Sequence, residues 1–137
     1  DFCLSRGLGD VYKRQVQIAK IAGPAATGVI VGAAWINSSP NPLSQKFVQA
    51  YKAQFNQDAD QFSAQAYTGV YILADAIKRA GLTGDTAKDR DAIKQALGQT
   101  KDLPTVLGNF SFLPSRDANH PPIVQEVDKN GNFVLYQ

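Results

Sequence analysis

The sequence predicts an α/β fold, and three observations support this prediction. A short apolar run, GVIVGAAW at residues 28–35, has the length and the β-branched content of a strand. Three segments between residues 41 and 98 place apolar residues on one helical face. After residue 104 the apolar residues recur at every second position, which is the period of a strand.

Residues 1–15, DFCLSRGLGDVYKRQ, are excluded from the fold prediction because they show neither helical nor strand periodicity. Their last six residues, DVYKRQ, resemble the translation of an adapter used to prepare sequencing libraries. We interpret the segment as adapter read-through, and a natural leader of low order is the alternative. The chain begins with Asp1 and contains no methionine, so we expect it to be a fragment of a longer reading frame.

The remaining residues are nearly neutral in charge. Three of the 14 basic and two of the 12 acidic residues lie in residues 1–15, which leaves 11 and 10. The pI of 8.7 therefore overstates the basic character, and nothing in the sequence predicts a nucleic-acid partner. No apolar run approaches the roughly 18 residues of a membrane span. No cysteine remains for a disulfide or for thiol chemistry.

The apolar run at 28–35 is continuous, and the polar stretch INSSPNP follows it. Continuous rather than alternating apolarity is typical of a strand covered on both faces, as in a parallel sheet. Such a strand needs neighbouring parallel strands, which we do not find in this sequence. We therefore expect the sheet to continue upstream.

The first and third helices are predicted from their caps and their apolar spacing. Asn41 with Pro42 starts the first, in which residues 47, 51 and 55 are aromatic and lie on one face. Thr86, with Asp89 three residues later as in a capping box, starts the third, which Gly98 ends.

The second helix is predicted from Asp60, its cap, to Gly81, its C-terminal stop. Its front mixes rings, amides and hydroxyls, whereas its rear is that of a buried helix. The predicted core stripe consists of Ala66, Val70, Leu73, Ile77 and Ala80, widened by Tyr67, Tyr71 and Ala74.

The end of the chain is predicted to be β-rich. Residues 106–112 have period two, and two apolar runs at 123–127 and 133–136 flank the sequence DKNGN. Gly131 in that sequence can take a positive φ at little cost, so a hairpin is expected.

Four stretches of the chain are similar to one known family. They are FVQAYKAQFNQDADQFSAQAYTGVYILADAIKRAG, DRDAIKQALGQT, VLGNFSF and IVQEVDKNGNFVLYQ. In this order and spacing they resemble the C-terminal third of the periplasmic branched-chain amino-acid binding proteins of ABC transporters. The resemblance runs from about residue 28 to residue 137, and none of the stretches is a catalytic motif.

The resemblance implies a type I periplasmic binding protein fold, of which this chain is a C-terminal fragment. Members have two hinged α/β lobes with parallel sheets flanked by helices, three crossover strands, and a ligand cleft between the lobes. Residues 16–38 are then part of the second lobe. Residues 39–107, with the three helices, belong to the first lobe, and residues 108–137 return to the second lobe with a C-terminal β-hairpin.

The same resemblance explains the polar front of the second helix as a ligand site. A helix N-terminus facing a cleft offers backbone N–H groups and the positive end of the helix dipole. Phe62 matches the family's position for a ring that packs on the ligand, and Gln65 and Tyr67 lie one turn further on. Trp35, at the end of the predicted strand, could stack on the ligand. Core packing is the alternative for Tyr67 and Trp35.

The implied function is capture of a branched-chain or related amino acid by hinge closure, followed by delivery to the membrane permease of an ABC transporter. No cofactor and no metal are expected, and the full-length protein is expected to be a monomer. We expect it in the periplasm, or outside the cell on a lipid anchor, with any signal peptide upstream of this sequence. The residues that hold the ligand's carboxylate and ammonium groups also fall upstream, so the exact ligand stays open.

Two alternatives remain. The same fold serves as the extracellular sensing domain of receptors and as amide- or urea-binding proteins. An α/β enzyme is less favoured, because the sole histidine, His120, lies in the proline-bounded loop ANHPP, where we expect it to be solvated. There is no cysteine pair, histidine cluster or G-x-S-x-G motif, so no catalytic residue is predicted.

Overall fold

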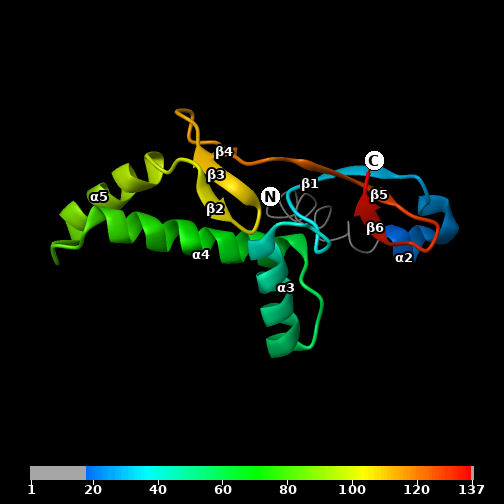
Figure 1. Cartoon of the computed structure of the whole chain (residues 1–137). Helices are drawn as coiled ribbons and strands as arrows, with labels where there is room; N and C mark the ends of the chain where they lie inside the picture. Colours follow the sequence, from blue (N-terminus) through cyan, green and yellow to red (C-terminus); the bar gives the residue numbers. More distant parts are fainter. Residues whose placement is uncertain (1–17, 137) are drawn as a thin grey trace, which may run out of the picture. The chain divides into compact units, whose positions relative to one another are not determined.

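The computed structural model describes residues 18–136, and these residues form two compact units (Figure 1). The first unit combines the residues up to Gly32 with those from Val124 onward, and the second holds Ala33–Ile123. The chain therefore leaves the first unit once and returns to it. The predicted lobe boundaries lie at 38/39 and 107/108, and the assignment of the units to lobes stays a prediction. Residues 1–15, interpreted as adapter read-through, lie outside the described part of the chain.

The first unit is built on a three-stranded sheet of order β1-β5-β6. Strands β5 and β6 are antiparallel, with Val127 opposite Phe133, and Gly131 in the turn between them has φ 80°. The predicted C-terminal hairpin is thereby confirmed. The buried centre of the first unit is formed by Ala26 and Val127, with Val29 packed against them. The elements are α2 (Ile18–Ala22), the 3-10 helix η2 (Gly23–Ala26), β1 (Ile30–Ala33), β5 (Ile123–Val127) and β6 (Phe133–Leu135).

Strand β1 is shorter than the predicted residues 28–35, and the described residues do not cover both of its faces. It is at one end of the sheet order, and Ile30 is 54% exposed. The continuous apolar run thus indicates more burial than these residues provide.

Three helices in the second unit confirm the three predicted segments: α3 (Pro42–Phe55), α4 (Gln61–Ala80) and α5 (Thr86–Gly98). Helix α3 begins as predicted, because Asn41 Oδ1 accepts the backbone N–H of Leu43 at 2.9 Å and Pro42 opens the first turn. The Asn41 amide nitrogen also donates to the Thr105 carbonyl, 2.9 Å away. One side chain thus joins the start of α3 to a segment 64 residues further along the chain.

Helix α5 has a different cap from the one predicted. Asp85, not Thr86, is the N-cap, and its carboxylate accepts the backbone N–H groups of Ala87 and Lys88. The carboxylate of Asp89 accepts instead from the loop before the helix, at Thr83 and Gly84. The predicted capping box was therefore wrong by one residue. An aspartate that precedes a threonine competes with it as a cap, and here the aspartate has the position.

Helix α4 buries a different face from the predicted stripe. Its buried residues are Ala64, Thr68, Ile72 and Ala76, spaced four apart. Val70 and Leu73, at the centre of the predicted stripe, are exposed. This part of the prediction is wrong for the residues that the structure describes.

A small antiparallel sheet of order β2-β3-β4 completes the second unit. Leu103 lies opposite Phe110, and Ser111 lies opposite Asn119. The prediction of period two from residue 106 missed β2, because Pro104 looked like a boundary and instead occupies the strand. The strands are β2 (Leu103–Thr105), β3 (Gly108–Phe112) and β4 (Ala118–Asn119).

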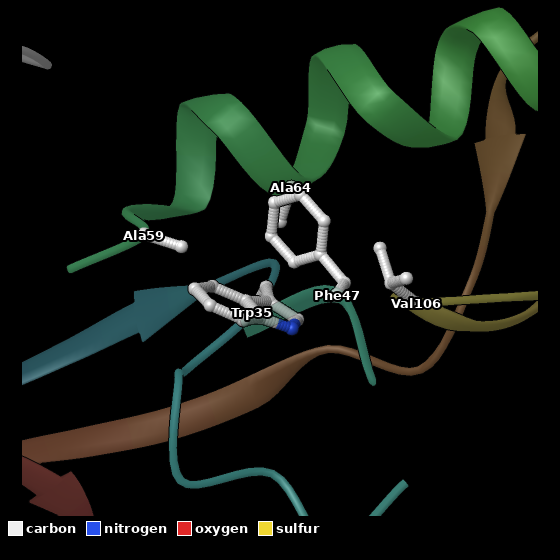
Figure 2. Packing of buried hydrophobic residues seen from close by; sticks show 5 residues of the cluster. All are labelled: Trp35, Phe47, Ala59, Ala64 and Val106. Carbon is white, nitrogen blue, oxygen red and sulfur yellow. The ribbon is translucent and has the colours of Figure 1, made fainter. Parts of the chain in front are cut away.

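The largest core cluster of the second unit lies beneath the first turns of α4 (Figure 2). Its aromatic members come from the loop after β1 and from α3. Ala59 and Ala64 come from the residues around the start of α4, and Val106 lies between β2 and β3. Their packing fixes the end of α4 that was predicted to face a ligand. The buried members are Trp35, Phe47, Ala59, Ala64 and Val106.

Candidate functional site

The front of α4, residues 60–68, is the candidate site, and its geometry begins with its cap. Asp60 Oδ1 accepts the backbone N–H of Ser63 at 2.8 Å, and Ser63 Oγ accepts the backbone N–H of Asp60 at 3.0 Å. This reciprocal capping box confirms Asp60 as the predicted cap. No acidic residue lies in the first helical turn itself, so the positive end of the dipole is offset by Asp60 alone among the residues of the cap and first turn.

Trp35 lies under this helix end as a core residue. It is 4% exposed, and its indole Nε1 donates to Ser44 Oγ at 2.7 Å. Its ring meets Phe47 edge-on, with centroids 5.9 Å apart. Figure 2 shows both rings between the loop after β1 and α4. Core packing was the alternative to ligand stacking that the sequence left open for Trp35. A direct contact between Trp35 and the ligand stays a prediction.

Phe47 connects the aromatic side chains of α3 and α4. Its centroid lies 4.8 Å from that of Tyr67 and 5.6 Å from that of Tyr51. Tyr67 is 38% exposed and donates its hydroxyl to Tyr71 Oη at 2.9 Å. This hydrogen bond, with partial burial and the neighbouring phenol, raises the pKa of Tyr67. Tyr67 thus lies at the edge of the core, with its hydroxyl held by Tyr71.

Phe62 and Gln65 lie on another side of the helix. Phe62 is half-buried and Gln65 is exposed. Three residues apart, they share one face of α4, whereas Tyr67 is turned by about 160° from Gln65 at 3.6 residues per turn. The four predicted residues therefore do not converge. Phe62 and Gln65 form one surface, and Tyr67 and Trp35 belong to the packing around Phe47.

Ser44 is a residue that the sequence prediction missed. It is fully buried and holds the indole of Trp35. Its only signal was its position three residues before Phe47, on the same helical face. A serine in the first turn of a helix is equally typical of a solvated position, so this spacing does not distinguish a buried Ser44 from a solvated one.

Residues that bind metals do not gather in the described part of the chain, and its histidine is packed against a ring. Within residues 18–136 there is no group of three histidine, cysteine, aspartate or glutamate side chains that could hold a metal ion. His120 stacks on the ring of Phe110, with centroids 6.5 Å apart, and its Nδ1 lies 3.2 Å from the Pro121 carbonyl oxygen. It is therefore partly packed, where the sequence predicted a solvated histidine. In the same range of residues, no helix combines the length and the apolarity that crossing a bilayer requires.

Comparisons with known proteins extend these observations. A family model described as "Periplasmic binding protein" matches residues 12–132, a range that includes residues 12–15 of the segment excluded above. A Leu/Ile/Val-binding protein homologue of Brucella melitensis is 32% identical over 85 residues, which make up 62% of this chain and 22% of that protein.

Two solved structures show the same fold. A leucine-binding protein of Thermotoga maritima superimposes with a TM-score of 0.75 at 25% identity, over 89% of this chain and 33% of that one. A leucine-, isoleucine-, valine-, threonine- and alanine-binding protein of Brucella ovis, in a closed conformation, gives 0.73 at 22% identity, over 87% and 33%. The chain thus spans about a third of the length of these structures.

Proposed function

Because the chain belongs to the periplasmic binding protein family, we propose that it is part of the extracytoplasmic solute-binding component of an ABC transporter. Proteins of this family bind solutes rather than transform them. The fold is that of a type I periplasmic binding protein, present here in part. The observation that supports a branched-chain amino acid as the ligand is the 32% identity to a Leu/Ile/Val-binding protein homologue.

The proposed mechanism is hinge closure. The chain leaves the first unit between Gly32 and Ala33 and returns to it between Ile123 and Val124. Two compact units connected by single backbone crossings can change their mutual orientation without unfolding either core. In the family's mechanism, a ligand that contacts both lobes of the full-length protein favours the closed arrangement by the free energy of the added contacts. A membrane permease then recognises the closed form and accepts the ligand.

The proposed ligand contact from this chain is the surface formed by Phe62 and Gln65. Both lie within the first two turns of α4, near the positive end of the helix dipole. The ring of Phe62 suits an apolar ligand side chain, and the amide of Gln65 can donate or accept a hydrogen bond. Tyr67 and Trp35 support this helix end through Phe47 and Ser44. The groups that hold the ligand's carboxylate and ammonium are proposed to lie upstream of this sequence.

Isothermal titration calorimetry tests the proposal on the protein extended upstream, in its own reading frame, to the length of its relatives. Leucine, isoleucine and valine should bind, and the chain of 137 residues alone should bind none of them tightly. Binding of acetamide or urea in place of all three amino acids would support the amide-binding alternative instead. Tight binding of leucine by the 137-residue chain would contradict the proposal that part of the ligand site lies upstream of this sequence.

Phe62→Ala tests the residue itself. In the extended protein we expect leucine affinity to fall by about tenfold, which corresponds to about 1.4 kcal/mol, with an unchanged circular dichroism spectrum. Phe55→Ala, which also removes a ring from the second unit, is the matched control and should bind as the parent does. Equal affinity of the parent and Phe62→Ala would remove Phe62 from the site.

A further inference from the structure

The turn that joins β5 to β6 contains the pair Asn130–Gly131 (Figure 1). The carbonyl of Asp128 accepts the backbone N–H of Gly131 at 3.0 Å, and the N–H of Asp128 donates to the Asn132 carbonyl at 2.9 Å. Gly131 has φ 80°, so residues 129–131 form a hairpin loop that ends in a glycine bulge. Asparagine and glycine are preferred in such turns, and the pair therefore has a structural role.

The same pair is chemically labile. Asparagine is among the residues of a protein that heat and time degrade, and its side-chain amide is lost by deamidation. In that reaction the backbone nitrogen of the next residue attacks the amide carbon. Glycine has no Cβ to hinder the attack, because backbone groups can approach each other closely at this residue. Asn130 is exposed, so water reaches the site.

Deamidation at this pair takes two steps. In the first, the nitrogen of Gly131 loses its proton and bonds to Asn130 Cγ. The bond from Cγ to the side-chain nitrogen breaks, and ammonia leaves with the proton, which produces a cyclic imide. In the second, one water molecule opens the ring at either carbonyl, so that residue 130 becomes an aspartate or an isoaspartate. Water is the only other reactant.

The hydrogen bonds of the turn oppose the first step. The proton that must leave Gly131 is held by the Asp128 carbonyl. Asp128 Oδ1 also accepts the backbone N–H groups of Asn130 and Asn132, each at 2.8 Å, and so fixes the backbone on both sides of the attacking nitrogen. The hydrogen bond from the Asn132 N–H, with others from Asn130 and from both side-chain amides, lowers the pKa of Asp128. An ionised carboxylate is a strong acceptor for such bonds.

We propose that Asn130 is a site of spontaneous deamidation, and that Asp128 is the positioning residue that slows the reaction in the folded protein. The nucleophile, the carbon it attacks and the residue that keeps them apart all lie within residues 128–132. The inference depends on this hairpin and not on a ligand, so it can fail while the proposed function stands.

Deamidation would disturb the first unit. An aspartate at position 130 removes an amide donor and places a second negative charge beside Asp128. An isoaspartate also lengthens the backbone of a short loop, which changes how the two strands meet. Phe133, the first residue of β6, packs against the buried pair Ala26 and Val127. The first unit should therefore lose stability as Asn130 is converted.

Mass spectrometry of the protein extended upstream tests the proposal. The protein is incubated at neutral pH, folded or in urea, in water enriched in heavy oxygen. The water that opens the ring then labels only the product formed during the incubation. Trypsin cleaves after Lys129, and the peptide that begins at Asn130 also contains Asn132. Asn132 is the internal control, because the side chain of Phe133 hinders attack by the next nitrogen.

In urea, Asn130 should acquire the label faster than Asn132. In the folded parent, the rate at Asn130 should be at least about tenfold lower, because attack then requires local opening of the turn. Asp128→Ala should raise the rate in the folded protein about fivefold. Asp128→Asn keeps an acceptor oxygen in place and should stay within about twofold of the parent.

Absence of label at Asn130 in urea would overturn the proposed site. Equal rates in the folded and the urea-treated parent would overturn the protection by the turn. Equal rates in folded Asp128→Ala and in the parent would show that Asp128 does not position the backbone. Circular dichroism identifies a variant that fails to fold, and the comparison of folded and urea-treated parent, which needs no substitution, then decides.

Discussion

The front and the rear of α4 differ in how they are supported. At the front, the capping box of Asp60 and the rings under Ala64 hold the helix with contacts made inside this chain. At the rear, Val70, Tyr71 and Leu73 are exposed on a face free of the Asp75–Arg79 ion pair. The front is thus held by contacts among the described residues, whereas these residues leave Val70, Tyr71 and Leu73 exposed. The difference teaches that apolar spacing predicts a helix, whereas the burial of each of its faces depends on which residues pack against it.

Removing the ring of Phe47 should have the largest effect, because the front depends on it. Phe47 is buried and contacts the rings of Trp35, Tyr51 and Tyr67. Phe47→Ala should lower the free energy of unfolding of the second unit by about 3–5 kcal/mol. Denaturant unfolding followed by circular dichroism and by the fluorescence of the single tryptophan, which lies in this unit, measures the change.

The matched control for Phe47→Ala is Phe55→Ala in the same helix. Phe55 is 56% exposed and contacts the Tyr51 ring at a centroid distance of 4.7 Å. We expect the control to cost less than about 1 kcal/mol. Similar losses from the two substitutions would contradict the assignment of Phe47 as the centre of the front.

Removing the cap should have the next largest effect. Asp60→Ala takes away the acceptor for the Ser63 N–H and should destabilise the second unit by about 1 kcal/mol. Asp60→Asn keeps an oxygen in the same place and should recover most of the loss. If the alanine and asparagine variants unfold at the same denaturant concentration, the hydrogen bond is not what stabilises this helix end.

Two substitutions, Thr68→Val and Val70→Thr, compare a buried and an exposed position of α4. Thr68 is 2% exposed, and its Oγ1 is buried without a hydrogen-bond partner among the described residues. Thr68→Val should therefore stabilise the second unit, by up to about 1 kcal/mol. Val70→Thr makes the reverse change at a position of α4 that is 67% exposed, and it should alter the stability of the 137-residue chain by less than about 0.5 kcal/mol. Destabilisation by Thr68→Val would show that its hydroxyl has a partner.

The smallest effect is expected from pH, at the loop that follows the rear of α4. Hydrogen bonds from the backbone N–H of Lys88 lower the pKa of Asp85, and those from Thr83 lower the pKa of Asp89. A carboxyl whose pKa is lower in the folded state stabilises that state above its unfolded pKa of about 3.9. This contribution should be lost as pH falls through the lower folded pKa values. Thermal unfolding from pH 6 to pH 2 measures the loss, which should be smaller in Asp89→Asn.

The sequence predicted the elements of this chain better than their burial. Helix starts depend on short-range hydrogen bonds, so Asn41 and Asp60 were identified from their neighbours alone. Where two neighbouring residues can both cap a helix, the sequence does not show which one does, and Asp85 is the N-cap of α5 where Thr86 was predicted. The stripe through Val70 was predicted as core from its apolar spacing, but Val70 and Leu73 are exposed and Ile77 and Ala80 are only half-buried.

The candidate site was less predictable than the fold. The roles of Trp35 and Tyr67 depend on Phe47 and Ser44, which lie between 9 and 23 residues away from them along the chain, and a single sequence does not show which distant residues pack together. Phe62 and Gln65 are not among the residues of that cluster, and their proposed role depends on family resemblance and on their position at the front of α4.

Asn41 limits which substitutions the start of α3 can accept. Aspartate, serine and threonine are nearly interchangeable with asparagine at most helix starts. Here the oxygen of the side chain serves the helix, while its nitrogen holds the Thr105 carbonyl. An aspartate would place negative charge against that carbonyl, and a serine would be too short to reach both partners. An engineer who ranks replacements by capping preference alone would therefore choose wrongly at this position, and asparagine is the residue to keep.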